Sequence, residues 1–232
     1  DDIALTPCSN PDKLKASFGL SNKEKFILYV PTFRGVDGGG LNWLESFDAA
    51  KWDNLLGEID AHLFIKLHSY DRELLLGKCA LIEDSTRIHQ LLWDAAPDIN
   101  RLYPIVDMVI SDYSSLIFDY AQLARPLVLF TPDLEDYMGE RGFYEPYKLL
   151  SNGREATCEA SLMTELKRSA TQWNSQDQKW VNDIAHRFNQ FRDTCNSQRI
   201  VNGIFDRFSR DSHRVALEKS SSFNDQSRNQ PL

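Results

Sequence analysis

The sequence predicts an α/β protein with a Rossmann-like parallel sheet that carries helices on both faces. Short apolar runs alternate along the 232 residues with segments whose apolar side chains recur at helical spacing. The apolar runs are continuous and do not alternate with polar residues, which is typical of parallel strands buried on both faces. A hydrophobic fraction of 42% is enough for a real core.

The expected strands are the short apolar runs Phe26–Val30, His62–His68, Arg87–Trp93, Met108–Ser111 and Pro126–Phe130. Between them we expect helices over 41–59, over Asp71–Leu76, after an N-cap at Asp98, and over Ser115–Leu123. Beyond Tyr147 the chain becomes more polar, and three amphipathic helices are expected over Ser161–Trp173, Asp177–Phe191 and Gln198–Phe208.

The domain organisation follows from these segments. Residues 1–25 are expected to form a linker and entry helix, and residues 26–208 a Rossmann-like domain with C-terminal helices. Residues 209–232 are rich in Ser, Asn, Gln and Arg with few apolar side chains, so we expect a disordered polar tail. The first residue is not Met, and we expect a piece excised from a longer protein.

Composition excludes several classes of function. A net charge of -8 argues against nucleic acid as the main partner, and an anionic ligand would need local positive charge. The four cysteines are widely spaced without a CxxC, so neither a zinc site nor a disulfide framework is expected. No apolar stretch reaches the roughly 18 residues that span a bilayer, and the first residues lack the pattern of a signal peptide.

Polar clusters follow three of the predicted strands. They are Pro31-Thr32-Phe33-Arg34, Lys66-Leu67-His68 and Ser111–Ser115. Ligands of open parallel sheets bind beyond the carboxyl ends of the strands, so the three clusters are expected to meet at one edge. The Gly38–Gly40 run fits neither GxGxxG nor a P-loop, and no GxSxG elbow is present.

Each polar residue has a functional and a structural interpretation. Ser114 and Ser115 at a helix start suit a phosphate, although an ordinary N-cap explains them too. Asp119 suits polyol hydroxyls, or a solvated helix face. Arg34 and Lys66 supply cations, and His68 can donate a proton near neutral pH or serve a structural role.

Five motifs resemble a known family. YVPTFR, KLH, the block DINRLYPIVDMVISDYSSLIFDYAQLARPLVLF, DLEDYMGERGFY and DTCNSQRIVNGIF are similar to the carboxyl-terminal half of CDP-glycerol glycerophosphotransferases. These enzymes are teichoic-acid polymerases and primases, with related capsule polymerases. The resemblance runs from about residue 26 to residue 208, and its central block is specific.

The resemblance implies the carboxyl-terminal half of a GT-B fold that binds a CDP-alditol donor, CDP-glycerol or CDP-ribitol. It implies donor contacts from Pro31 and Thr32 and from the Ser114-Ser115 pair, with Asp119 as the following acid. Lys66 and His68 match its R/K-x-H segment near the pyrophosphate, with Lys where many relatives have Arg. Arg34 and Arg199 fall in family-like motifs without an assigned contact, and Arg34 is expected among the substrate-binding residues.

The implied reaction transfers polyol phosphate to a hydroxyl of a growing polymer and releases CMP. The expected acceptor is a polyol-phosphate or glycan, lipid-linked in some relatives, and no cofactor or metal is expected. In the family the general base is a histidine of an amino-terminal GT-B domain that this chain lacks. We expect a cytoplasmic location, with any membrane contact carried by that missing part. Two alternatives stay open, namely a GT-B glycosyltransferase that uses a nucleotide sugar, and a non-catalytic nucleotide-binding or scaffold domain.

Overall fold

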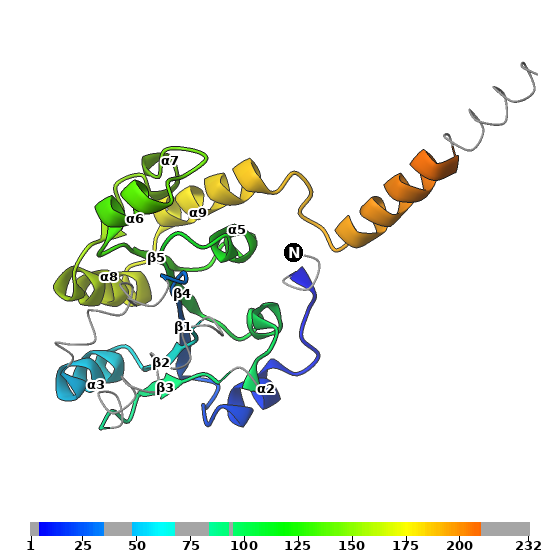
Figure 1. Ribbon diagram of the computed structural model, residues 1–232. Coiled ribbons are helices and arrows are strands. Elements are labelled where there is room, and N and C mark those ends of the chain that lie inside the picture. Colours follow the sequence, from blue (N-terminus) through cyan, green and yellow to red (C-terminus); the bar gives the residue numbers. More distant parts are fainter. Residues whose placement is uncertain (1–4, 35–47, 68–83, 93–94, 210–232) are drawn as a thin grey trace, which may run out of the picture. The chain divides into compact units, whose positions relative to one another are not determined.

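The computed structural model describes residues 5–34, 48–67, 84–92 and 95–209, which Figure 1 shows in colour. The chain divides into two compact units. One unit runs from Ile3 to Arg192, and the other comprises residues 1–2 and 193–232. The predicted helix Asp71–Leu76 and residues 210–232 of the predicted tail lie outside the described residues. The division after Arg192 falls inside the predicted domain 26–208, whose boundaries stay a prediction.

The larger unit contains a parallel sheet, as the sequence predicts. In the described residues it has six strands, in the order β3-β2-β1-β4-β5-β6. All neighbouring strands pair in parallel. The strands are β1 (Lys25–Val30), β2 (Ala61–Ile65), β3 (Ile88–Gln90), β4 (Met108–Ser111), β5 (Leu127–Phe130) and β6 (Glu155–Ala156). The strand order reverses between β1 and β4, and ligands of doubly wound sheets bind at such a switch point.

Helices precede, connect and follow the strands along the chain. They are α2 (Pro11–Ser17), α3 (Ala49–Glu58), the 3-10 helix η5 (Ile99–Leu102), α5 (Leu116–Ala121), α6 (Leu134–Glu140), α7 (Lys148–Ser151), α8 (Glu159–Thr171) and α9 (Ser175–Phe188). α2 lies in the predicted entry segment, and α8 and α9 match two of the predicted C-terminal helices to within a few residues.

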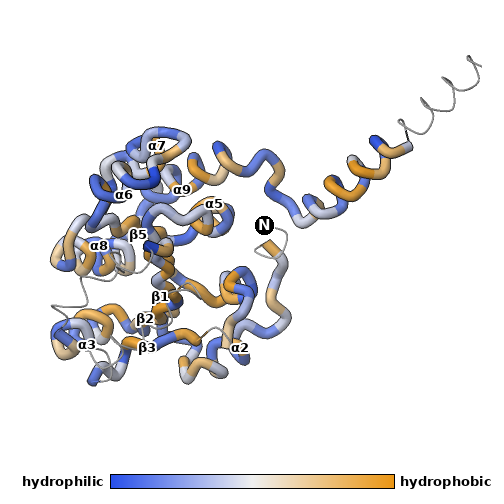
Figure 2. The backbone as a smooth tube through the Cα atoms, viewed as in Figure 1, coloured by the Kyte–Doolittle hydropathy of each residue, from blue (hydrophilic) through white to orange (hydrophobic). Residues whose placement is uncertain are grey.

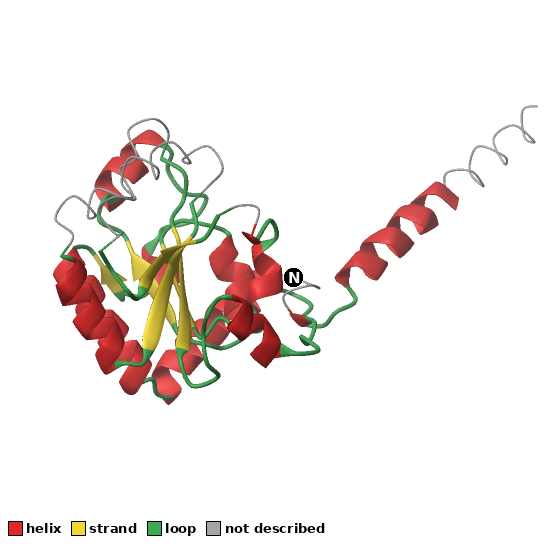
Figure 3. Ribbon diagram, turned by 90° about the horizontal axis from the view of Figure 1, so that it is seen from below, coloured by secondary structure: helices red, strands yellow, loops and turns green. Residues whose placement is uncertain are grey.

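The core has two layers because successive strand residues point to opposite faces of the sheet. On one face, Ile27 and Tyr29 of β1 pack with α3 and α8. On the other face, Phe26 and Leu28 pack with α5 and α9. Figure 2 shows the apolar strands as a continuous orange region, and Figure 3 shows the yellow strands between helices. The predicted sheet with helices on both faces is confirmed.

Several elements differ from the sequence prediction. β2 ends at Ile65, so Lys66 already lies in the loop beyond the strand. The segment capped by Asp98 forms only the short η5, and the side chain of Asp98 accepts a hydrogen bond from Asn100 N as predicted. β6 has only two residues and was not predicted. Neither were the short helices α6 and α7.

Two histidines lie on the neighbouring strands β2 and β3. His62 Nδ1 is 2.8 Å from His89 Nε2, and His62 Nε2 is 3.2 Å from Glu24 Oε1. Burial, and then the charge of His62, lower the pKa of His89. An unfolded chain, with an ordinary histidine pKa of about 6.5, therefore binds the proton of residue 89 more tightly than the folded chain does.

The free energy of unfolding is expected to decrease as the pH falls from 7.5 to 5.5, because His89 must then be protonated against its environment. Urea unfolding at the two pH values measures this decrease. His89→Gln removes the titrating group and is expected to show a smaller decrease than the unchanged chain. An equal decrease in both proteins would contradict the assignment to His89.

The smaller unit contains one described helix over residues 196–209, close to the predicted Gln198–Phe208. Arg199 donates to the side chains of Asn196 and Asp193 within this unit. Exposed apolar side chains lie along the helix at Ile200, Val201, Ile204, Phe205 and Phe208. Among all the described helices, none is both long enough and apolar enough to cross a membrane.

Candidate functional site

A cavity of about 610 Å³ lies at the carboxyl ends of the strands, beside the reversal between β1 and β4. Its lining comes from the segments that follow four strands, β1 to β4. It includes Pro31 and Thr32 after β1, Lys66 after β2, the 97–100 segment after β3, and Ser114 after β4. The structure therefore brings together four residues that the sequence predicted to share one site.

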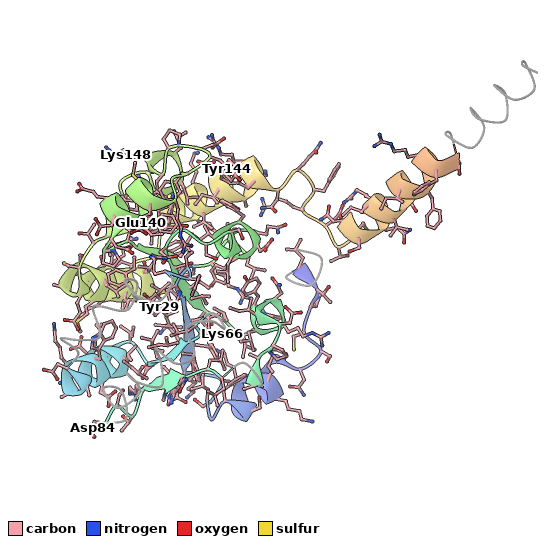
Figure 4. All side chains as sticks on the ribbon, viewed as in Figure 1. Tyr29, Lys66, Asp84, Glu140, Tyr144 and Lys148 are labelled. Carbon is pink, nitrogen blue, oxygen red and sulfur yellow. The ribbon has the colours of Figure 1, made fainter. Side chains whose placement is uncertain are left out.

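Lys66 is the cation of this cavity among the described residues. Although it lies in a loop, only 5% of the residue is exposed, and its burial lowers the pKa of the amine. Figure 4 labels Lys66 beside the strands. A negatively charged ligand in the cavity would favour the charged form of Lys66 and offset part of the cost of burying it. The position therefore suits a phosphate.

The two serines after β4 differ in their surroundings. Ser114 Oγ accepts a hydrogen bond from Leu116 N at 3.3 Å, so part of its role is that of a helix cap. Ser115 is exposed, and its side chain makes no cap hydrogen bond. α5 has only six residues, shorter than predicted, so its dipole is smaller than that of a long helix. The hydroxyl groups are therefore the main donors that this turn offers a ligand.

Arg34 lies in a hydrogen-bonded network behind the cavity. Its Nε donates to Asp133 Oδ2 at 2.6 Å, its Nη2 to Asp112 Oδ2 at 2.6 Å, and its Nη1 to the carbonyl oxygen of Thr32 at 2.7 Å. The guanidinium carbon lies 4.6 Å from the ring centre of Tyr113 and 4.9 Å from that of Tyr137. Arg34 thus joins the loops that follow β1, β4 and β5.

Charge and burial act together in this network. Burial alone would lower the pKa of Arg34, but the hydrogen bond to Asp133 and the charges of Asp112 and Asp133 outweigh it and raise that pKa. Burial would raise the pKa of Asp133, and the hydrogen bond from Arg34 lowers it instead. Arg34 was predicted to contact substrate. Its described partners are protein groups, and it is absent from the cavity lining, so that contact stays a prediction.

Asp112 fixes the position of Thr32, one of the predicted donor contacts. Its carboxylate accepts hydrogen bonds from Thr32 N at 2.9 Å, from Thr32 Oγ1 at 2.6 Å and from Tyr113 N at 2.5 Å. Its carbonyl oxygen accepts one from Tyr147 Oη at 2.8 Å. The prediction of site residues did not include Asp112 or Asp133. Asp112 directly follows β4, and Asp133 lies shortly after β5. These positions at strand ends are the sequence signal that could have identified both residues.

Among the described residues, the predicted site residues Arg34, Ser115 and Asp119 do not line this cavity. Asp119 lies on α5 outside the cavity lining, and burial raises the pKa of its carboxyl. After burial, the charge of Asp119 contributes to the raised pKa of Tyr103, the residue that follows η5. His68 lies outside the described residues. Within the described part of the chain, no group of three or more His, Cys, Asp or Glu residues is placed to hold a metal ion.

Comparisons with known proteins agree with the fold and the motifs. A family model described as CDP-Glycerol:Poly(glycerophosphate) glycerophosphotransferase matches residues 5–206. The teichoic acid ribitol-phosphate polymerase TarL of Staphylococcus aureus is 28% identical over 183 residues, covering 78% of this chain and 31% of that protein. The teichoic acid glycerol-phosphate primase of Bacillus subtilis is 29% identical over 204 residues, covering 87% of this chain and 49% of that protein.

A solved structure of the wall teichoic acid polymerase TagF superimposes with a TM-score of 0.64 and 26% identity, over 87% of this chain and 47% of that one. This likeness confirms the predicted half of a GT-B fold. The chain spans between about a third and a half of the length of these relatives. Because the family model covers most of the sequence, this chain belongs to the CDP-glycerol:poly(glycerophosphate) glycerophosphotransferase family.

Proposed function

We propose that this chain is the donor-binding half of a transferase that moves polyol phosphate from a CDP-alditol to a hydroxyl of a teichoic-acid-like or capsular polymer. The observation that carries the proposal is the cavity at the strand reversal, where buried Lys66 meets Thr32 and Ser114. Membership of the family and the likeness to TagF, which has also been solved with CDPG, support CDP-glycerol or CDP-ribitol as donor.

In the proposed reaction, an acceptor hydroxyl oxygen forms a bond to the β-phosphorus of the donor. The bond from that phosphorus to the bridging oxygen breaks, and CMP leaves with the electron pair. The hydroxyl proton passes to a base that the family resemblance assigns to an amino-terminal domain. The chemical demand on this half is then to position the diphosphate and to neutralise its charge.

The residues present suit these tasks. We assign the diphosphate to Lys66 and to the hydroxyl groups of Ser114 and Ser115, with Pro31 and Thr32 forming the cavity wall beside it. A protonated Lys66 would stabilise the charge that develops on the departing CMP. No cofactor beyond the activated donor is part of the proposal. Asp119 is assigned to donor hydroxyl groups, which need an acceptor.

Calorimetric titration with CDP-glycerol, CDP-ribitol, UDP-GlcNAc and CMP tests the proposed donor. At least one CDP-alditol is expected to bind more tightly than UDP-GlcNAc. Ser115→Ala is expected to weaken that binding by about tenfold or more, because a hydrogen bond to a charged phosphate contributes about 1.5–3 kcal/mol. Ser175→Ala, an exposed serine outside the cavity, is the matched control and should have no effect. Binding of UDP-GlcNAc alone would favour the nucleotide-sugar alternative.

His68 is proposed to donate a hydrogen bond or a proton to the leaving phosphate. In the full enzyme, His68→Ala is expected to lower the turnover number at least about tenfold, and about a hundredfold or more if His68 acts as a general acid. Release of CMP from CDP-glycerol or CDP-ribitol measures the turnover. An unchanged turnover number would remove His68 from the mechanism.

A further inference from the structure

A second cavity, of about 410 Å³, lies against the same Ser114-Ser115 turn. We call it the aromatic cavity. Its walls come from the turn after β4, from α5, α6, α7 and α9, and from the segment 142–147. Ser114 lines both cavities. A ligand in the aromatic cavity would therefore lie next to a phosphate group bound at this turn, on a different side of the turn from the cavity of about 610 Å³ that contains Lys66.

Aromatic rings make up much of the lining. Tyr113 and Tyr137 stack with ring centres 4.1 Å apart, and Phe118 and Phe188 stack at 4.0 Å. Phe143 lies 5.5 Å from Tyr113 in a tilted arrangement. Tyr147 and the fully exposed Tyr144 complete the aromatic set, and Figure 4 labels Tyr144 between α7 and α9. Such a lining favours a ligand with flat apolar faces.

The polar groups of the aromatic cavity are few and mostly uncharged. They are the hydroxyl groups of Ser114 and Ser115 and those of the tyrosines. Glu145 is the one charged residue in the described part of the lining, and it forms an ion pair with Arg187 at 2.5 Å. Among the residues that the structure describes, the lining contains neither Lys nor Arg. A chain of phosphodiesters would meet aromatic rings and a carboxylate whose partner Arg187 is already paired, with no Lys or Arg in the described lining to neutralise its own charge. A neutral ligand needs no such cation.

We propose that the aromatic cavity binds a neutral pyranose ring at the acceptor end. The C–H faces of such a ring would pack on the side chains around Tyr113 and Phe143, and its hydroxyl groups would bond to the serine and tyrosine hydroxyls. The acceptor of this protein is then a glycan hydroxyl and not the end of a polyol-phosphate chain. The inference rests on the proposed function, because it takes the donor phosphate to lie at Ser114 and Ser115.

The position suits an acceptor because the attacking hydroxyl must lie within about 3–3.5 Å of the phosphorus. Ser114 and Ser115 line the aromatic cavity and Lys66 does not, so a ring there would approach a phosphate at this turn from the aromatic cavity. A volume of about 410 Å³ is within the range of small-ligand sites and leaves room for more than one polar contact. An isoprenyl chain would cover the exposed Ser115 hydroxyl without offering it a hydrogen bond, at a cost in free energy.

Titrations of the whole chain, followed by the amide shifts of residues 113–118 and 142–150, test the proposal. The probes are methyl N-acetylglucosaminide, a glycerol phosphate trimer and farnesol. We expect only the glycoside to shift these amides. Phe143→Leu and Tyr144→Ala are expected to weaken glycoside binding at least about fivefold, because each removes an aromatic face. Phe191→Ala, an exposed ring outside both cavities, is the matched control.

A parallel titration with CDP-glycerol and CDP-ribitol separates this inference from the proposed function. The variants at Phe143 and Tyr144 are expected to keep their CDP-alditol affinity within about twofold, because these residues line only the aromatic cavity. Failure of both CDP-alditols to bind would contradict the donor assignment. Three results would overturn the pyranose site itself. The glycoside could fail to bind, the two variants could leave glycoside binding unchanged, or the trimer or farnesol could shift the same amides.

Discussion

Asp112→Ala is expected to lower the free energy of unfolding by about 3–5 kcal/mol, the usual cost of leaving one member of a buried ion pair behind. The carboxylate is almost fully buried and bonds to Arg34 at 2.6 Å. Its removal also leaves the backbone N–H groups of Thr32 and Tyr113 without their acceptor. The loops after β1 and β4 would then lose the contacts that hold them together.

Urea unfolding at neutral pH measures this loss. The matched control is Asp183→Ala, which breaks an exposed ion pair with Lys179 and is expected to cost less than about 1 kcal/mol. A small change for Asp112→Ala, similar to that of the control, would mean that the network around Arg34 contributes little to the stability of the site.

Lys66→Met is expected to weaken CDP-alditol binding by about tenfold to a hundredfold. Methionine keeps much of the volume of the buried side chain, so the loss isolates the charge, and a charged hydrogen bond to a phosphate contributes about 1.5–3 kcal/mol. Lys148→Met removes an exposed lysine outside the cavity and is the matched control. Equal affinities of the two variants would remove Lys66 from the phosphate site.

Lys66 also leads us to expect that donor binding depends on pH. Burial lowers the pKa of Lys66, so its amine loses the proton at a lower pH than an exposed lysine does. The affinity for the donor is therefore expected to fall as the pH rises into the alkaline range, and a bound phosphate moves this fall to higher pH. Calorimetry from pH 7 to pH 10 checks it. If the donor affinity of the unchanged chain depended on pH in the same way as that of Lys66→Met, the assignment of this fall to Lys66 would be contradicted.

The sequence predicted the elements that have a strong periodic signal. β1 and β4 are continuous apolar runs, and both occur at the predicted positions because nothing competes with burial there. β6 is only two residues long, and its pairing with β5 supplies what its own sequence does not specify. The segment after Asp98 has helical spacing, yet forms only one turn of 3-10 helix before the chain enters β4.

The sequence predicted several site residues from their positions shortly after strands. Pro31, Thr32, Lys66 and Ser114 share a cavity, as the position of each after a strand indicated. Asp112 and Asp133 stand near strand ends, but their pairing with Arg34 was not predictable. Asp133 is 99 residues from Arg34 and meets it only after β5 is placed beside β4. The aromatic cavity was also missed. The close spacing of Tyr137, Phe143, Tyr144 and Tyr147 was its only signal, and such spacing is equally typical of a core.

The central claim is that the diphosphate of a CDP-alditol binds at the reversal between β1 and β4. Amide shift mapping of the isotope-labelled chain during titration with CDP-glycerol and CDP-ribitol tests it most directly. The largest shifts are predicted at Thr32, Lys66, Ser114 and Ser115, with smaller shifts over residues 97–100. Shifts concentrated on another surface, such as the cavity beside Arg154 and Lys179, with these residues unmoved, would contradict the account.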